Sequence, residues 1–111
     1  MNIPDIAKAL EFKYYTPEDE VDEKNVKGCY IGDLLSLAMA RVECDNVWIT
    51  IQTNINIVAV ASLADAAFIL LPEGFEPDEN TLERAVEQKI CILGTDLTAY
   101  QAAVKLAELG V

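Results

Sequence analysis

One segment of this chain, residues 47–65, constrains its fold more than any other. It reads VWITIQTNINIVAVASLAD, an apolar strand that leads through a polar junction into an almost wholly apolar helix. The junction holds five hydrogen-bonding side chains, Thr50, Gln52, Thr53, Asn54 and Asn56. Polar residues gathered between two apolar elements mark the place where an α/β fold usually binds ligands.

The same alternation of strand and helix extends along the rest of the chain. Runs typical of strands occupy residues 11–15, 26–31, 47–51, 66–71 and 90–93. Helical patterns occupy residues 4–10, the stretch after residues 32–33, residues 55–63, a stretch from about residue 78 or 80, and residues 98–109. Central strands that are apolar on both sides indicate a mostly parallel sheet covered by helices. We therefore predict an α/β fold with a sheet of about four to five strands, and one domain over residues 1–111.

The charge of the chain limits its partners. It carries 19 acidic against 8 basic residues, a net charge of −11, and no basic stripe. Nucleic acids and anionic membrane surfaces would be repelled, so we expect neither as a partner. No apolar run approaches the about 20 residues of a membrane span, and the N-terminus lacks the pattern of a signal peptide. We expect a cytoplasmic protein.

Catalytic and metal-binding chemistry has little support in the residue types present. The chain has no histidine, which excludes Ser-His-Asp and Cys-His arrangements within it. The cysteines form no CxxC pair; we expect Cys29 and Cys91 to be buried thiols and Cys44 to lie in an exposed turn. The acidic stretches 18–23 and 73–83 lack a calcium-loop ladder and are interpreted as solvated loops. We expect no enzyme activity, no metal and no cofactor.

Three strand-to-helix junctions are expected to meet at the carboxyl edge of the parallel sheet. We predict a small-ligand crevice there, formed by Gly32, Asp33, Thr50, Gln52, Thr53, Asn54, Thr95 and Asp96. Gly32 would let a ligand approach the backbone, and free N–H groups of the helix starts could hold an anion. The alternative is that these are turn residues and helix caps, with Asp33 and Asp96 at two helix starts. A separate capping-box spacing, Asn80 with Glu83, marks the fourth helix.

The helix over residues 55–63 is apolar around most of its circumference, so it is expected to be buried on both sides. In a domain this small, a second subunit is one way to bury the outer side, and alanines would allow a close approach. We predict a C2 homodimer interface through Ile55, Val58, Ala59 and Leu63. The alternative is that elements of the same chain cover both sides of the helix.

The motifs of the chain resemble those of the DRTGG domain family over nearly its whole length. The matching stretches are VKGCYIGDLLS (residues 26–36), WITIQTNINIVAVASL (48–63), the apolar strand followed by PDE (77–79), and Thr95-Asp96. The motif that names the family falls at residues 23–29 and is altered. Glu23-Lys24 keeps the acid–base order and Gly28 keeps one glycine, while Lys27 and Cys29 replace the threonine and the second glycine.

The resemblance implies a fold similar to the N-terminal domain of HPr kinase/phosphorylase, pairing as dimers, and regulation or assembly in place of catalysis. We therefore expect a non-catalytic regulatory module, a homodimer that senses a small ligand at the carboxyl edge, docks onto a metabolic enzyme, or does both. The alternative is an assembly adapter without a small ligand, for a redox or hydrogenase-type enzyme as in some relatives. Acidic loops and an exposed tyrosine of the Tyr14-Tyr15 pair would then contact the partner.

Overall fold

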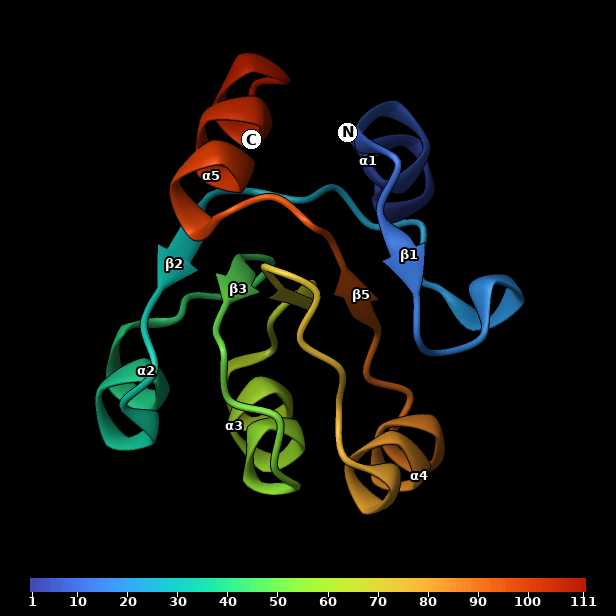
Figure 1. Ribbon diagram of the computed structural model, residues 1–111, viewed down its shortest axis with the longest axis vertical. Helices are drawn as coiled ribbons and strands as arrows, with labels where there is room; N and C mark the ends of the chain where they lie inside the picture. Colours follow the sequence, from blue (N-terminus) through green and yellow to red (C-terminus); the bar gives the residue numbers. More distant parts are fainter.

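A five-stranded, mostly parallel sheet lies between two layers of helices in the computed structural model, which describes all residues 1–111 (Figure 1). The strand order is β1-β5-β4-β3-β2, and only β1 is antiparallel to its neighbour, β5. The elements in chain order are α1 (Ile3–Leu10), β1 (Lys13–Tyr14), the 3-10 helix η1 (Glu18–Glu20), β2 (Cys29–Ile31), α2 (Leu35–Arg41), β3 (Val47–Ile49), α3 (Asn56–Ala64), β4 (Phe68–Leu71), α4 (Glu79–Gln88), β5 (Ile92–Gly94) and α5 (Ala99–Glu108). The predicted α/β fold with a mostly parallel sheet is confirmed.

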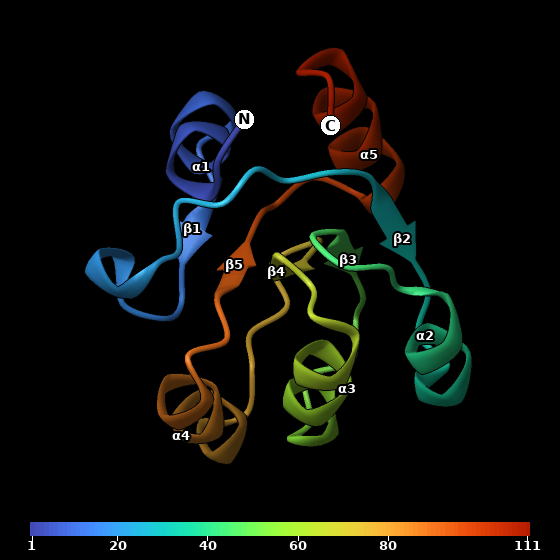
Figure 2. The same cartoon turned by 180° about the vertical axis from the view of Figure 1, so that it is seen from behind.

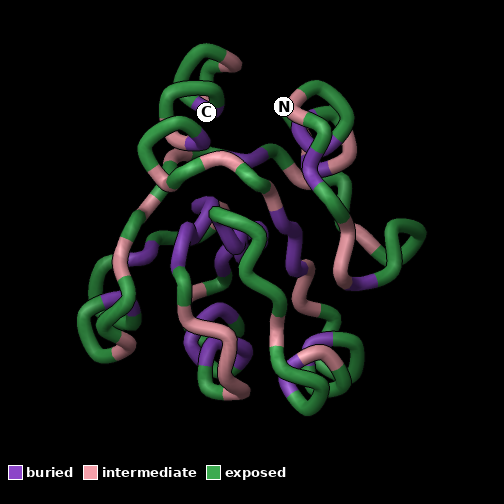
Figure 3. Tube along the Cα trace, in the orientation of Figure 1, coloured by how far each residue is buried: buried purple, intermediate pink, exposed green.

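Two hydrophobic cores, one on each face of the sheet, follow from the alternation of side chains along the strands. Val47 and Ile49 of β3 pack with α1 and α5, while Trp48 between them packs with α2, α3 and α4. All three are fully buried, as is the whole of β4, because both faces of these central strands are covered (Figure 3). Figure 2 shows α1 and α5 on one side of the sheet and α2, α3 and α4 on the other.

The connection from β1 to β2 crosses the amino edge of the sheet, because these two strands lie at its opposite ends. Backbone bonds attach this connection to the rest of the domain: the Val26 amide donates to the Met1 carbonyl at 2.8 Å, and the Lys27 amide donates to the Asp45 carbonyl at 2.9 Å. In Figure 1 the connection runs as an extended chain beneath α5 and α1.

Several local predictions need correction. The Asn80–Glu83 capping box is absent: α4 is preceded by Asp78, whose side chain makes no capping bond. Cys29 is exposed and not buried, because β2 is an edge strand with a neighbour on one side only. Cys91 is partly buried, and Cys44 is exposed as predicted. Strands β1, β2 and β5 are also shorter than their apolar patterns.

No helix of the structure has both the length and the apolar character needed to cross a membrane.

Candidate functional site

A network of side chains at the carboxyl edge joins the ends of β2 and β3. The Thr50 hydroxyl and the Ile51 amide both donate to Asp33 Oδ1 at 2.9 Å. Gln52 Nε2 donates to the Asp33 carbonyl at 2.8 Å, and Asn54 Nδ2 donates to Gln52 Oε1 at 2.8 Å. We call Asp33, Thr50, Gln52 and Asn54 the carboxyl-edge network. The structure thus brings these four predicted residues together, beside Gly32.

The other predicted crevice residues lie at the same edge but face different neighbours. Thr53 belongs with α4: its hydroxyl lies 3.3 Å from Asp78 Oδ1, and the Thr81 hydroxyl donates to its carbonyl at 2.8 Å. Thr95 and Asp96 follow β5, and β4 separates that strand from β3. The Thr95 carbonyl accepts from the Gly74 amide at 3.0 Å, in the loop after β4. The eight residues therefore line the edge in three groups.

Two expectations about the helix starts are wrong. Helix α2 begins after Leu34, and the Asp33 carboxylate does not cap it. The carboxylate instead accepts from the Thr50 hydroxyl and the Ile51 amide, which directly follow β3. Helix α5 is capped by Thr98, which forms a capping box with Gln101, and not by Asp96.

Gly32 serves the packing of a neighbouring ring. A Cβ at Gly32 would lie 2.9 Å from the ring of Tyr30, so the space that we expected for a ligand is filled by that tyrosine. The Gly32 carbonyl accepts from Trp48 Nε1 at 3.0 Å. Since Asp33 Oδ1, Gln52 and Asn54 already bond to one another or to their neighbours, a ligand that used these groups would have to replace existing hydrogen bonds.

A groove of about 570 Å³ runs between α3 and α4, and its lining includes all four residues predicted for a dimer interface. The lining residues are Ile55, Asn56, Val58, Ala59, Ser62, Leu63, Arg84 and Gln88. None of them is acidic, although the chain has 19 acidic residues. We call this hollow the α3–α4 groove.

The outer side of α3 is not covered by the rest of the chain. Val58 is 1% exposed and forms the floor of the groove, whereas Leu63 is 73% exposed beside it. Ala59 and Ser62 are exposed between them. The rest of the chain therefore buries one side of α3, and the alternative that elements of the same chain cover both sides does not hold.

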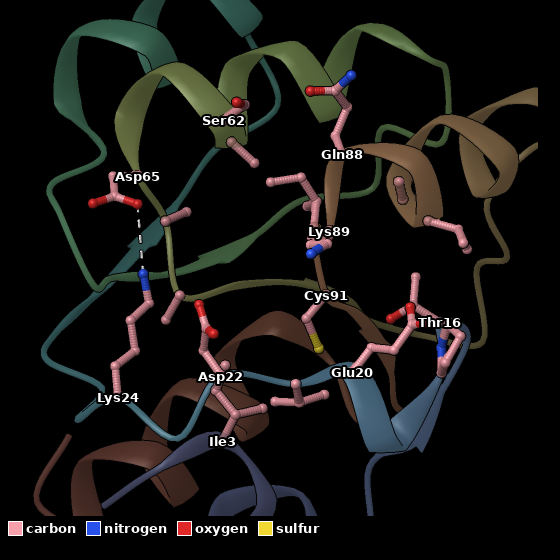
Figure 4. A pocket seen from close by; sticks show the side chains of 18 residues that line it. Ile3, Thr16, Glu20, Asp22, Lys24, Ser62, Asp65, Gln88, Lys89 and Cys91 are labelled. Atoms are coloured by element: carbon pink, nitrogen blue, oxygen red, sulfur yellow. Dashed lines mark ion pairs between the residues drawn. The ribbon is translucent and has the colours of Figure 1, made fainter.

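A second hollow, of about 270 Å³, lies at the amino edge of the sheet, and sequence reasoning missed it (Figure 4). It is bounded by the C-terminal ends of α3 and α4, the residues that precede β4 and β5, and the connection over residues 16–24. Polar lining residues are Thr16, Glu20, Asp22, Lys24, Ser62, Asp65, Gln88 and Lys89, and Cys91 lies among them. We call it the amino-edge cavity. The connection that covers this edge follows from the strand order, which no local pattern of the sequence reveals.

Lys24, from the altered family motif, holds one wall of this cavity in place. Its Nζ lies 3.2 Å from Asp45 Oδ1 and 3.5 Å from Asp65 Oδ1. Burial lowers the pKa of Lys24, but its bonds to Asp45 and its attraction to Asp65 outweigh burial and raise the pKa overall. The Cys44 thiol, 3.3 Å from Asp65 Oδ2, and Lys24 both lower the pKa of Asp65.

The remainder of the motif shapes a turn. Gly28 has φ +74, which favours glycine, and a Cβ there would lie 3.0 Å from Asn46 Nδ2. That amide donates to the Lys27 carbonyl at 2.7 Å and so fixes the connection against the turn before β3. Lys24, Lys27 and Gly28 of this stretch therefore have a structural role within this chain.

The sequence matches no protein-family model and no curated protein. Among solved structures, the chain is similar to the CBS and DRTGG domains of the regulatory region of Clostridium perfringens pyrophosphatase, a complex with the activator diadenosine tetraphosphate. The TM-score is 0.71 at 13% sequence identity. The match covers 95% of this chain and 45% of that one, so this chain spans less than half of its neighbour. The likeness shows a DRTGG-like fold.

Proposed function

We propose that this chain is a non-catalytic regulatory module that works as a homodimer, with the α3–α4 groove as its pairing face. The observation that carries the proposal is the groove itself, an uncovered hollow whose lining is half hydrophobic and contains no acidic residue, in a chain of net charge −11. The regulatory role is supported by the likeness of the fold to a regulatory region that was solved with a bound activator.

A second copy of the chain fits the groove by shape and by charge. Leu63 protrudes with 73% of its surface exposed, next to a hollow flanked by the small residues Ala59 and Ser62. In a C2 pair each Leu63 would enter the hollow of the other subunit. Two chains of the same net charge repel one another, and they approach at lower cost through a face where no carboxylate lines the hollow and the carboxylate of Glu87 is paired with Arg84. Arg84, the only charged residue of the lining, lies 3.5 Å from Glu87.

Within this proposal the carboxyl-edge network keeps α2 and α3 in one arrangement. It joins the residues that precede α2 to those that precede α3 by hydrogen bonds from Thr50 and Gln52 to Asp33. Helix α3 packs closely against both α2 and α4, so a displacement of α3 on pairing reaches both neighbours. Regulation would then be a shift between paired and unpaired populations.

Sedimentation equilibrium of the wild-type chain and of Leu63→Glu tests the proposal. We expect a concentration-dependent dimer for the wild type and a monomer for Leu63→Glu, because the carboxylate added at position 63 would have to leave water to enter the hollow of the other subunit. Tyr100→Glu is the matched control: Tyr100 is 76% exposed on α5, far from the groove, and its substitution adds the same charge.

A wild type that stays monomeric at every concentration would refute the pairing, and so would a Tyr100→Glu variant that dissociates as readily as Leu63→Glu. Thermal unfolding of both variants checks that they remain folded, which we expect because exposed positions tolerate such changes. A monomer that holds a stoichiometric protein partner would instead favour the adapter.

A further inference from the structure

The amino-edge cavity contains charged groups of both signs that have no partner. The ion pairs of the structure join Lys24 to Asp45, Lys24 to Asp65, and Arg84 to Glu87. The ammonium of Lys89 and the carboxylates of Glu20 and Asp22 line the same hollow, are exposed to solvent and form no ion pair. In Figure 4, Lys89 lies on the side of α4, and Glu20 and Asp22 lie on the side of the connection over residues 16–24.

The ends of two helices add to the field of this cavity. Asp65 and Lys89 are the residues at which α3 and α4 end, so the carbonyl ends of both helices border the hollow. A helix C-terminus carries a partial negative charge, which favours a cation beside it. The carboxylates and the helix ends therefore attract an ammonium group, while Lys89 attracts a carboxylate.

The size and the apolar share of the lining limit what can enter. The volume of about 270 Å³ is just below the about 300–1,000 Å³ typical of pockets for drug-sized ligands, so the occupant is a small metabolite. Half of the lining is hydrophobic, including Ile3, Ala61 and Val86, and suits a short aliphatic stem. A nucleotide is disfavoured, since its phosphates would lie against Glu20, Asp22 and Asp65.

The geometry points to a binding site for a small zwitterion of the α-amino acid class in the amino-edge cavity, with its carboxylate on Lys89 and its ammonium toward Glu20 and Asp22. Lys24 does not serve as a ligand group, because it is already bound to Asp45 and Asp65. Its role is to hold the wall that carries Asp22 against the end of α3.

The cavity also meets the pairing face of the domain. Ser62 and Gln88 line both the amino-edge cavity and the α3–α4 groove. A ligand that orders the ends of α3 and α4 therefore acts directly on the walls of the groove, and ligand and dimer are linked. The link between ligand binding and dimerisation rests on the proposed function, whereas ligand binding in the cavity of one chain does not.

Isothermal titration with three compounds that share the same short aliphatic stem tests the site. L-2-aminobutyrate carries both charges, butyrate only the carboxylate and propylamine only the ammonium. We expect saturable binding of 2-aminobutyrate and at least about tenfold weaker binding of the other two, because each lacks one charge-assisted contact. Equal binding of propylamine or butyrate, or no binding of any of several small L-amino acids, would overturn the proposal.

Variants identify the cavity as the place of binding. Lys89→Gln and Glu20→Gln are each expected to weaken binding by about tenfold or more. Lys105→Gln and Glu108→Gln on α5, which remove the same charges away from the cavity, are expected to leave it unchanged. A control that weakens binding as much as its matched variant would refute the site.

Lys89→Gly separates binding from folding. Lys89 has φ +56, a conformation in which glycine is favoured at the end of a helix, so this variant is expected to unfold at a higher temperature and yet lose the ligand. Binding that persists in Lys89→Gly would count against the assigned carboxylate contact.

The Leu63→Glu variant distinguishes failure of the site from failure of the pairing. We expect 2-aminobutyrate to bind Leu63→Glu, because the cavity lies within one chain, and to change the dimerisation constant of the wild type only. Binding without any change in dimerisation would refute the coupling while the site stands. Loss of binding in both proteins would refute the site.

Discussion

Removing the Asp33 carboxylate tests whether the carboxyl edge is held by the hydrogen-bond network or by a helix cap. In the structure, Asp33 Oδ1 accepts from the Thr50 hydroxyl and from the Ile51 amide, both at 2.9 Å. Asp33→Ala leaves both donors without this acceptor. Asp33→Asn, which keeps a side-chain oxygen, is the milder companion variant.

The expected loss of stability depends on how well water can replace the carboxylate. Thr50 is 1% exposed, so its hydroxyl would remain buried without an acceptor, which costs about 1–3 kcal/mol. Ile51 is 44% exposed and its amide is within reach of solvent, so it adds little. Asp33 is itself exposed, which reduces the electrostatic gain of its charge. We expect Asp33→Ala to lower the free energy of unfolding by about 1–2 kcal/mol, and Asp33→Asn by less than about 1 kcal/mol.

A double-mutant cycle with Thr50→Val distinguishes the network from a cap. Valine has the shape of threonine but no hydroxyl, so in Asp33→Ala it removes the unsatisfied donor and is expected to cost nothing further. The coupling energy should then be about 1 kcal/mol, within the range of residues in direct contact. Urea unfolding at constant m-value gives these energies. Additive effects, or Asp33→Ala within about 0.5 kcal/mol of the wild type, would refute the network.

Three further variants test other features of the domain. The Tyr14 hydroxyl is buried without a partner, whereas that of Tyr15 donates to the Phe75 carbonyl at 3.1 Å. In urea unfolding, Tyr14→Phe should raise the free energy of unfolding and Tyr15→Phe should lower it, each by about 1 kcal/mol. The reverse order would contradict this reasoning. Burial raises the pKa of Cys91 to about 12. Because the unfolded thiol ionises first, stability should fall as pH rises from about 9 toward 12, by up to about 1.4 kcal/mol per unit for this thiol. Cys91→Ala should reduce that slope and leave the part that comes from Cys29, whose pKa burial raises to about 11.

The fold class could be predicted because the central strands are apolar at every position. VWI and FILL bury both faces, which is possible only inside a sheet covered on both sides. The order of the strands could not be predicted, and Cys29 shows the consequence. Its strand has the composition of a buried one, yet it lies at the edge of the sheet, where one side has no neighbour.

The polar residues of the carboxyl edge could be predicted as a group, but their partners could not. Short-range capping rules assign Asp33 to α2, while a contact with Thr50, 17 residues away in the sequence, takes its carboxylate. The amino-edge cavity lacks any sequence signal of its own. Its lining comes from four separate stretches, within residues 3–24 and 61–91, and they meet only because the connection over residues 16–24 crosses the sheet.

Helices α3 and α4 are joined firmly at one end only, and this asymmetry connects the two hollows. At their N-terminal ends, the Thr53 carbonyl accepts from the Asp78 amide at 3.0 Å and from the Thr81 hydroxyl at 2.8 Å. At their C-terminal ends, the amides of Asp65 and Lys89 donate within their own helices, and no hydrogen bond joins α3 to α4. These C-terminal ends border the amino-edge cavity, and α3 is held there by the connection over residues 16–24 through the Lys24–Asp65 ion pair and not by α4. An occupant of the cavity therefore acts on two helix ends that no hydrogen bond joins to each other, and a small change of their spacing alters the groove in which Leu63 of a second copy would lie.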